Sequence, residues 1–362
     1  MRILILVNVG ATLYKFRREL IDALLERGDS VYISSAQSPR LDYFTRLGCQ
    51  IIETPLDRHG VNPLRDINLV LFYKRTIKNL KPDVVLSFTQ KPNIYGGYIC
   101  GRLGIPFLPT ITGLGTGVFY SGRLIRRIVF ALYRLGLKRV PQVFIQNEGC
   151  RELLQKERVI RDNFRLIPGS GVNLNRFRFE EYPDETSTIR LLYIGRMLFD
   201  KGMNEFFYCV EKMKNKYPQV IFEFLGPHND DFKEIIDRLL AEDKLILYSE
   251  TDDVRPYLKK CSVLVHPSYH EGMANVLLEA AATGRPVLAS RIPGCQETFE
   301  EGVTGLGFEP RNSDDLCRAV EEFIGLSYER RKEMGLKGRL KMERDFDRKR
   351  VVQEYLDELG KL

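Results

Sequence analysis

Short apolar stretches with strand character alternate with helix-forming stretches along the first half of the chain. Strands are expected at residues 3–7, 30–34, 84–87 and 143–146, and helices over 16–27, 69–79 and 124–138. Runs of this length and spacing predict secondary structure through their hydrophobic periodicity. Strands that alternate with helices are typical of a parallel, doubly wound sheet. The pattern therefore predicts an α/β fold.

The second half repeats this alternation after a polar stretch over residues 180–188. Its strands are expected at residues 189–194, 220–225, 245–248, 263–266 and 286–289. A charged helical stretch from about Leu316 onward closes the chain. With 362 residues, the chain is long enough for two domains.

We expect two Rossmann-like doubly wound domains, residues 1–175 and 186–344, facing a central cleft. The C-terminal helix, about residues 345–362, is expected to pack back on the first domain. Ligands of open α/β sheets bind beyond the carboxyl ends of the strands. The cleft between the two domains is therefore the natural site.

Composition narrows the class of protein. No apolar run approaches the roughly 20 residues that span a bilayer, and the apolar start of the chain is better interpreted as a buried strand than as a signal peptide. The seven cysteines are scattered without a CxxC pair, which argues against a disulfide framework or a zinc site. We expect a cytoplasmic protein without a metal.

The positive charge lies in the first half. Residues 1–180 hold 28 Lys and Arg against 14 Asp and Glu, whereas the remainder holds 27 against 34. Within the first half, residues 123–139 are both basic and strongly apolar, and such a helix can lie on an anionic membrane surface. The alternative is a core-packing helix with a basic wet side. We expect peripheral contact with the inner face of the cytoplasmic membrane, but no nucleic-acid binding, because no aromatic-interleaved strand or recognition helix accompanies the charge.

One cluster in the second half carries most of the chemical information. A glycine turn, Ser268-Tyr269-His270-Glu271-Gly272, leads into the helix-forming run 276–282, which contains Glu279. Backbone N–H groups at such a turn are unpaired, and the helix dipole favours negative charge there. Two carboxylates beside a phosphate cradle suit a ligand with phosphate in its middle and hydroxyl groups at each end. A nucleotide-sugar fits that description.

A basic loop follows the first strand of the second half. Gly195 and Arg196 come directly after the strand, and Lys201 lies five residues further on. Arg196 can fork onto phosphate oxygens, and Lys201 can add a point charge. An ordinary surface loop is the alternative for these residues taken alone.

Together these residues resemble the retaining glycosyltransferases of family GT4, which have the GT-B fold. The pair Gly195-Arg196 with Lys201, and Glu271 with Glu279, carry the resemblance. Four flanking runs agree with it: residues 265–268, 282–287, 293–297 and 302–305. The resemblance implies an enzyme that moves a sugar from a nucleotide-sugar, expected to be UDP-linked, to an acceptor.

The resemblance also implies roles for individual residues. Arg196 and Lys201 would neutralise the donor diphosphate without a metal or another cofactor, and Glu271 would meet the transferred sugar beside its reacting face. These three residues are the expected catalytic set. The remaining donor-binding residues are expected to be Gly10, Gly195, Val254, Gly272, Met273, Ala274, Asn275 and Glu279. Of these, Glu279 would bind the ribose, and Val254 lies by the turn expected to hold the base.

The acceptor side departs from the family. Many members carry a histidine after the strand that corresponds to residues 84–87, but this chain has none there. Gln90 and Lys91 are candidates to take its place, and His59, in a loop, is a further acceptor candidate. The run Thr112-Gly113-Leu114-Gly115, with Phe119-Tyr120, resembles a loop of bacterial members that extend polyprenyl-diphosphate-linked sugars. We therefore expect a lipid-linked or other surface-glycan acceptor.

Two alternatives stay open at this point. Another GT-B enzyme, such as a nucleotide-sugar epimerase or a phosphorylase, would share the fold and the donor residues. A non-catalytic nucleotide-sugar-binding protein would bind the donor without turnover.

Overall fold

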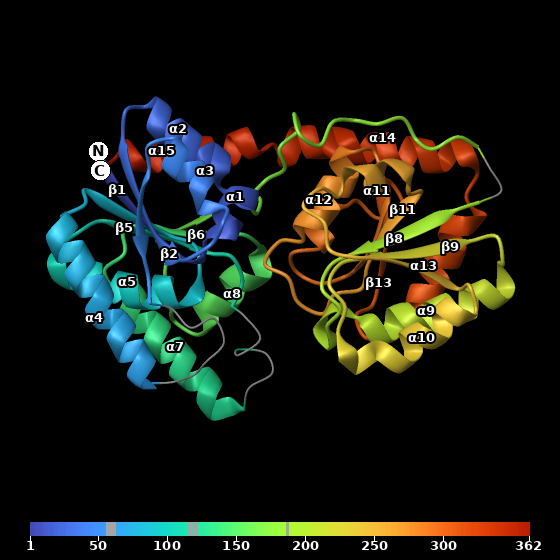
Figure 1. Ribbon diagram of the computed structural model, residues 1–362, viewed down its shortest axis with the longest axis horizontal. Helices are drawn as coiled ribbons and strands as arrows, with labels where there is room; N and C mark the ends of the chain where they lie inside the picture. Colours follow the sequence, from blue (N-terminus) through green and yellow to red (C-terminus); the bar gives the residue numbers. More distant parts are fainter. Residues whose placement is uncertain (56–62, 115–117, 119–121, 186–187) are drawn as a thin grey trace. The chain divides into compact units, whose positions relative to one another are not determined.

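The computed structural model describes residues 1–55, 63–114, 118, 122–185 and 188–362. The chain forms two compact units, shown in Figure 1. The first unit comprises Met1–Ser170 and Lys349–Leu362, and the second comprises Gly171–Arg348.

A parallel sheet of seven strands, in the order β3-β2-β1-β4-β5-β6-β7, forms the centre of the first unit. Its strands are β1 (Arg2–Val9), β2 (Ser30–Ala36), β3 (Gln50–Glu53), β4 (Val84–Ser87), β5 (Phe107–Ile111), β6 (Val143–Ile145) and β7 (Phe164–Leu166). The helices with this sheet are α1 (Gly10–Phe16), α2 (Arg18–Glu26), α3 (Leu41–Arg46), α4 (Pro63–Leu80), α5 (Gln90–Leu103), α7 (Arg123–Leu137), α8 (Glu148–Lys156) and α15 (Arg348–Leu359).

Helices cover both faces of this sheet, because alternate residues of a strand point to opposite faces. Leu4 and Leu6 of β1 join the core beneath α4, α5 and α7, whereas their neighbours Ile3 and Ile5 join the core beneath α1, α2, α3 and α15. Figure 1 shows these two helical layers on either side of the strands. The C-terminal helix α15 is fixed there by Tyr355, whose hydroxyl lies 2.6 Å from that of Thr110.

The second unit repeats the plan with six parallel strands in the order β10-β9-β8-β11-β12-β13. The strands are β8 (Arg190–Ile194), β9 (Ile221–Leu225), β10 (Leu245–Tyr248), β11 (Val263–His266), β12 (Val287–Ser290) and β13 (Gly305–Phe308). The helices are η1 (Phe199–Lys201), α9 (Met203–Lys216), η2 (Asp230–Phe232), α10 (Lys233–Ala241), α11 (Arg255–Lys260), α12 (Asn275–Ala282), η3 (Gln296–Thr298), α13 (Ser313–Gly325) and α14 (Tyr328–Asp345). One core lies beneath α9, α10 and α13, and the other lies beneath α11, α12 and α14.

The helix expected over residues 69–79 begins earlier, at Pro63, and two other predicted helices are each divided. The helix expected over residues 16–27 is two helices, because the chain leaves helical geometry at Arg17 between α1 and α2. The helix expected from about Leu316 onward is three helices, α13, α14 and α15. The side chain of Ser327 accepts a hydrogen bond from the N–H of Arg330 and so starts α14 anew. After α14, Asp347 bridges to Val172 and ends the helical run.

Strands β3, β5, β7 and β13 were missed by the sequence pattern. Strand β13 shows why, since its sequence Gly-Leu-Gly-Phe has weak strand propensity. A side chain at Gly305 would place its Cβ 2.4 Å from the carbonyl oxygen of Val287. The close approach of two backbones, and not the strand propensity of the side chains, therefore explains why this segment forms a strand.

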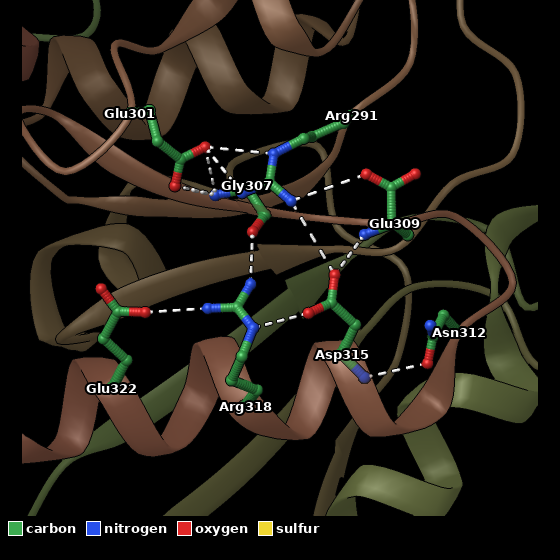
Figure 2. Close-up of polar contacts among 8 residues, drawn as sticks. All are labelled: Arg291, Glu301, Gly307, Glu309, Asn312, Asp315, Arg318 and Glu322. Atoms are coloured by element: carbon green, nitrogen blue, oxygen red, sulfur yellow. Dashed lines mark hydrogen bonds and ion pairs between the residues drawn. The ribbon is translucent and has the colours of Figure 1, made fainter.

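Charged side chains tie β13 to α13 at this edge of the second sheet. Figure 2 shows Arg291 beside Glu301, with 3.1 Å between Nη2 and Oε2. Arg318 of α13 donates to Asp315 at 2.6 Å and to the carbonyl of Gly307 at 3.1 Å. The ion pairs are largely exposed, so each one contributes little to stability. Together with the hydrogen bond from Arg318 to the carbonyl of Gly307, these contacts connect the edge strand to its covering helix.

The polar stretch before β8 is anchored to the second unit by Arg285. The Arg285 side chain is fully buried and donates to the carbonyl oxygens of Glu180 and Glu181, each at 2.9 Å. It also donates to the carbonyls of Leu258 and Lys259, at 2.9 and 2.8 Å. A buried cation stabilises a fold only when its donors are satisfied, so Arg285 locks the described part of this stretch onto α11.

Candidate functional site

The candidate site of the second unit lies where its strand order reverses, between β8 and β11. In open α/β sheets, ligands bind outside the carboxyl ends of the strands at this switch point. Gly195 and Arg196 follow β8 directly, and Glu271 lies on the loop after β11. Residues far apart in the sequence are therefore brought to one edge of the sheet.

The backbone of the loop after β8 lies close to two other loops, and a glycine allows each of these contacts. One glycine, Gly226, follows β9, and the other, Gly202, lies in the loop after β8 itself. A Cβ at Gly226 would lie 1.9 Å from the carbonyl oxygen of Gly195, and one at Gly202 would lie 2.0 Å from that of Pro267. Gly202 also has a φ of +73°, which favours glycine. The loops after β8 and β11 thus touch through their backbones, while Arg196 is exposed to solvent.

Lys201 and Glu271 form an ion pair across these loops. Lys201 Nζ lies 2.6 Å from Glu271 Oε1, and each side chain is 16 % exposed. His266, at the end of β11, places its Nε2 3.0 Å from the same carboxylate oxygen. An ionised carboxylate only accepts hydrogen bonds, so His266 donates from Nε2.

Burial would raise the pKa of the Glu271 carboxyl, but its two partners outweigh burial. The hydrogen bond from His266 and the positive charge of Lys201 hold this pKa far below its ordinary value. Glu271 is therefore an anion at neutral pH. An ionised, largely buried carboxylate beside a lysine can accept hydrogen bonds from ligand hydroxyl groups, and the lysine can turn toward a ligand phosphate.

Helix α12 begins immediately beyond this pair. Its first residue is Asn275, and no side-chain hydrogen bond caps its N-terminus at Ala274. The loop after β12 supports the turn, since the N–H of Ala274 donates to the carbonyl of Gly294 at 2.8 Å. The side-chain oxygen of Asn275 is buried without a hydrogen-bond partner among the described residues. The start of α12 thus presents polar backbone and side-chain groups at the same edge as Glu271.

The other donor-side residues have the following places. Gly272 and Met273 lie in the turn between Glu271 and α12, and Glu279 is half-buried in the second turn of that helix. Val254 precedes α11, beside the turn expected to hold the base. The structure gathers Lys201, Glu271 and the start of α12, and the roles of all these residues stay predictions.

In the first unit, the sheet order reverses between β1 and β4. Gly10 follows β1, and Gln90 and Lys91 begin the helix after β4. A Cβ at Gly10 would lie 2.6 Å from the Leu41 side chain, so a larger residue there would need Leu41 to shift. Lys91 is paired with Asp66 of α4 at 2.7 Å.

Several expected residues lie outside the part of the chain that the structure describes. His59 is one of them, and Gly115, Phe119 and Tyr120 are the others. Their expected acceptor contacts stay predictions.

Sequence reasoning overlooked the contact between His266 and Glu271. His266 is buried at the end of β11. Two features of the sequence could have indicated this contact. His266 is a polar residue at the carboxyl end of a strand, where ligand sites of such sheets lie, and it is only five residues from Glu271 across a tight loop.

Three further observations bear on the class of protein. Among the described residues, no group of three or more His, Cys, Asp or Glu is placed to hold a metal ion. All seven cysteines are free thiols. Within the described ranges, no helix combines the length and the apolar character needed to cross a membrane.

Comparison with known families decides the identity of the fold and the class of chemistry. A family model described as "Glycosyl transferases group 1" matches residues 175–341, and one described as "Glycosyl transferase 4-like" matches residues 2–147. The chain belongs to the GT4-type glycosyltransferases. It is therefore an enzyme, and its two Rossmann-like units form the GT-B fold.

Known relatives of this glycosyltransferase act in bacterial glycan assembly. One is the N,N'-diacetylbacillosaminyl-diphospho-undecaprenol alpha-1,3-N-acetylgalactosaminyltransferase of Campylobacter jejuni, 26 % identical over 336 residues that cover 88 % of each chain. Another is the capsular polysaccharide biosynthesis glycosyltransferase CapM of Staphylococcus aureus, at 22 % identity over 98 % of this chain and 95 % of CapM.

A solved structure of Anabaena HepE, in complex with UDP and glucose, superposes with a TM-score of 0.80 over all of both chains. The sequence identity is 16 %, so this likeness shows the fold alone.

Proposed function

We propose that this glycosyltransferase moves a hexose or N-acetylhexosamine from a UDP-sugar to a polyprenyl-diphosphate-linked or other surface-glycan acceptor, with retention of configuration. The placement of Lys201 and Glu271 against each other at the start of α12 carries the donor half of the proposal. The relative that uses an undecaprenyl-diphosphate-linked acceptor supports the acceptor half.

Donor binding follows from the charges at this site. The diphosphate accepts hydrogen bonds from the turn before α12 and is neutralised by Arg196 and Lys201, so that no metal is needed. When phosphate draws Lys201 away, Glu271 is released to accept hydrogen bonds from hydroxyl groups of the transferred sugar. Glu279, in the second turn of α12, accepts hydrogen bonds from the ribose.

The proposed transfer needs no enzymic nucleophile. The acceptor oxygen bonds to the anomeric carbon on the face from which the diphosphate leaves, while the bond between that carbon and the diphosphate oxygen breaks. The acceptor proton passes to an oxygen of the leaving diphosphate. Arg196 and Lys201 stabilise the charge that grows on the diphosphate, which is where electrostatic catalysis is most effective.

A lipid-linked acceptor requires contact with a membrane, and two helices of the first unit have suitable surfaces. On α7, Leu124 is 70 % and Ile128 50 % exposed between exposed arginines. On α4, Ile67 and Leu71 are 55 % and 54 % exposed. Both helices pack on α5. Exposed apolar side chains between basic ones are typical of surfaces that dock on anionic lipid, and this observation supports peripheral binding to the inner face of the cytoplasmic membrane.

A thermal-shift screen of nucleotide-sugars tests the donor assignment. Ligand that binds only the folded state raises the unfolding temperature by mass action. At least one of three UDP-sugars should raise the unfolding temperature more than any GDP- or ADP-sugar does at equal concentration. The three are UDP-glucose, UDP-N-acetylglucosamine and UDP-N-acetylgalactosamine. A larger shift with a GDP- or ADP-sugar would contradict the choice of UDP. A shift with a UDP-sugar, but no release of UDP when any acceptor is added, would favour a non-catalytic binding protein.

A further inference from the structure

Tyr269 holds together three segments around the Lys201–Glu271 pair. It lies two residues before Glu271 and is only 4 % exposed. Its N–H donates to the carbonyl of Asp200 at 2.9 Å. Its ring lies edge-on to Phe199 with 5.6 Å between centroids, and the Arg311 guanidinium lies 4.8 Å from the ring centroid. Tyr269 thus contacts the loop after β8 and the loop after β13.

The third segment is α9, which contributes a buried carboxylate. The hydroxyl of Tyr269 donates to Glu205 Oε2 at 2.6 Å. Glu205 is 7 % exposed and lies between the core residues Met203 and Phe206. Removing a carboxylate from water is costly, and an apolar side chain of similar size would often serve stability as well or better. Glu205 therefore calls for a role beyond stability.

The position of this hydrogen bond indicates that role. Glu205 lies four residues after Lys201 on the same chain segment, and Tyr269 lies two residues before Glu271. A short hydrogen bond to a buried carboxyl oxygen is strong and directional. The bond between Tyr269 and Glu205 therefore joins the two segments that carry Lys201 and Glu271, close to both.

We propose that Tyr269 and Glu205 are a positioning pair that sets the separation of Lys201 and Glu271 and thereby the rate of the transfer step. This proposal rests on the donor-site function proposed above. Neither residue touches the ligand in this account. Small displacements of catalytic groups lower rates strongly even when binding is retained, so loss of the pair should act on kcat more than on the affinity for UDP.

Four variants separate positioning from stability: Tyr269→Phe, Glu205→Leu, Glu205→Gln and the double variant Tyr269→Phe/Glu205→Leu. Turnover is measured as UDP release from the UDP-sugar that shifts the unfolding temperature most, with water as acceptor. Each of Tyr269→Phe and Glu205→Leu removes one partner of this buried hydrogen bond, so both should lose thermal stability and about tenfold in kcat. Glu205→Gln keeps an acceptor oxygen and should stay within about twofold of the wild type.

The double variant decides the question. It leaves no unpaired polar group, so its unfolding temperature should return close to that of the wild type. Its kcat should stay about tenfold low, and its dissociation constant for UDP should change less than about threefold, because the bond that positions the loops is still absent. Recovery of kcat together with stability would overturn the proposal and leave the pair a purely structural contact.

Tyr208→Phe is the matched control. Tyr208 lies on the same helix and its hydroxyl also donates to a carboxylate, that of Asp314 at 3.2 Å, but at the surface. This variant should match the wild type in both stability and kcat. The donor-site assignment predicts that Lys201→Ala binds UDP more weakly than the wild type does. Titration of UDP into both proteins tests this, and equal binding would mean that the assignment itself fails. If Lys201→Ala does bind UDP more weakly, a wild-type kcat in the double variant contradicts the positioning-pair proposal and leaves the donor-site assignment standing.

Discussion

At the scale of single residues, the charge state of Glu271 is set by its neighbours. Its burial favours the neutral acid, whereas His266 and Lys201 favour the anion and prevail. A carboxyl whose pKa is lower in the folded than in the unfolded chain contributes stability above its unfolded pKa, and that contribution is lost as the pH falls toward the folded pKa. The ionised form of Glu271 thus contributes to folding at neutral pH.

Replacing Glu271 by glutamine should therefore destabilise the protein in a pH-dependent way. At pH 7 the free energy of unfolding should fall by about 1–2 kcal/mol, the order expected for losing hydrogen bonds with charged partners. The difference from the wild type should be about 0.8 kcal/mol smaller at pH 4, because the unfolded carboxyl, with an ordinary pKa of 4.5, then takes up protons. Urea denaturation at both pH values measures this.

Glu250→Gln provides the comparison, since Glu250 is exposed in the same unit. Its difference from the wild type should be small at both pH values. A Glu271→Gln difference that is the same at pH 4 and pH 7, or larger at pH 4, would show that the Glu271 pKa is not lowered.

Residue types were easier to predict than residue contacts. Lys201 and Glu271 were both candidates from the spacing of motifs, but their mutual ion pair was not foreseen. The partners of Glu271 come from β11 and from the loop after β8, which the strand order of the sheet brings together. A sequence pattern describes one segment at a time, so Glu205 gave no sign that it contacts Tyr269, which lies 64 positions further along the chain.

At the scale of elements, α7 is the clearest case of a helix with two different sides. Phe130, Tyr133 and Leu137 are buried against the sheet, whereas Leu124, Ile125 and Ile128 are exposed. A helix that packed only against the core would keep such apolar residues inward. One face of α7 therefore packs on the core, and the other is apolar, basic and exposed. Contact of that exposed face with a membrane stays a prediction.

Charge reversal of Arg123, Arg126 and Arg127 to Glu should weaken pelleting with vesicles that contain anionic lipid. Each basic residue near an anionic surface contributes about 1 kcal/mol, so the triple variant should bind at least tenfold more weakly. Arg126 also pairs with Glu157 at 3.0 Å. The double variant Arg123→Glu/Arg127→Glu leaves that pair intact and should still bind more weakly than the wild type.

Reversal of Arg46 on α3, Lys349 on α15 and Lys361 just after α15 gives a similar change of net charge. Helices α3 and α15 pack on the other face of the sheet. This control should pellet like the wild type. Equal loss in both triple variants would mean that net charge, rather than α7, governs binding. Absence of pelleting by the wild type at low salt would end the membrane assignment.

Elements with strong periodicity were placed well, and weak ones were not. Strands β4, β10 and β11 begin and end where the pattern predicts. Strand β13 is held by neighbouring backbones and by the charged residues of Figure 2 instead. The break at Arg17 and the restart at Ser327 depend on local geometry and capping, which hydrophobic periodicity does not record.

At the scale of the whole molecule, the two units share one plan. Six neighbouring strands of the first sheet have the same order as the six strands of the second, and both orders reverse beside the first strand of the unit. This arrangement explains why the two predicted donor loops meet at one edge. The fold class was predictable because alternating strands and helices allow few other topologies.

The central claim is that Arg196 and Lys201 bind the diphosphate of the donor. Titration of UDP and of uridine, by calorimetry, into the wild type and the Arg196→Ala/Lys201→Ala variant tests it most directly. Lys212→Ala, an exposed lysine on α9, is the control. We predict that the wild type and the control bind UDP at least a hundredfold more tightly than uridine, since two charge-assisted phosphate contacts contribute about 3 kcal/mol or more. The double variant should keep only the part of this preference that the N–H groups of the turn before α12 supply, so the ratio of the two affinities should fall by about tenfold or more. An undiminished preference for UDP in the double variant would contradict the account.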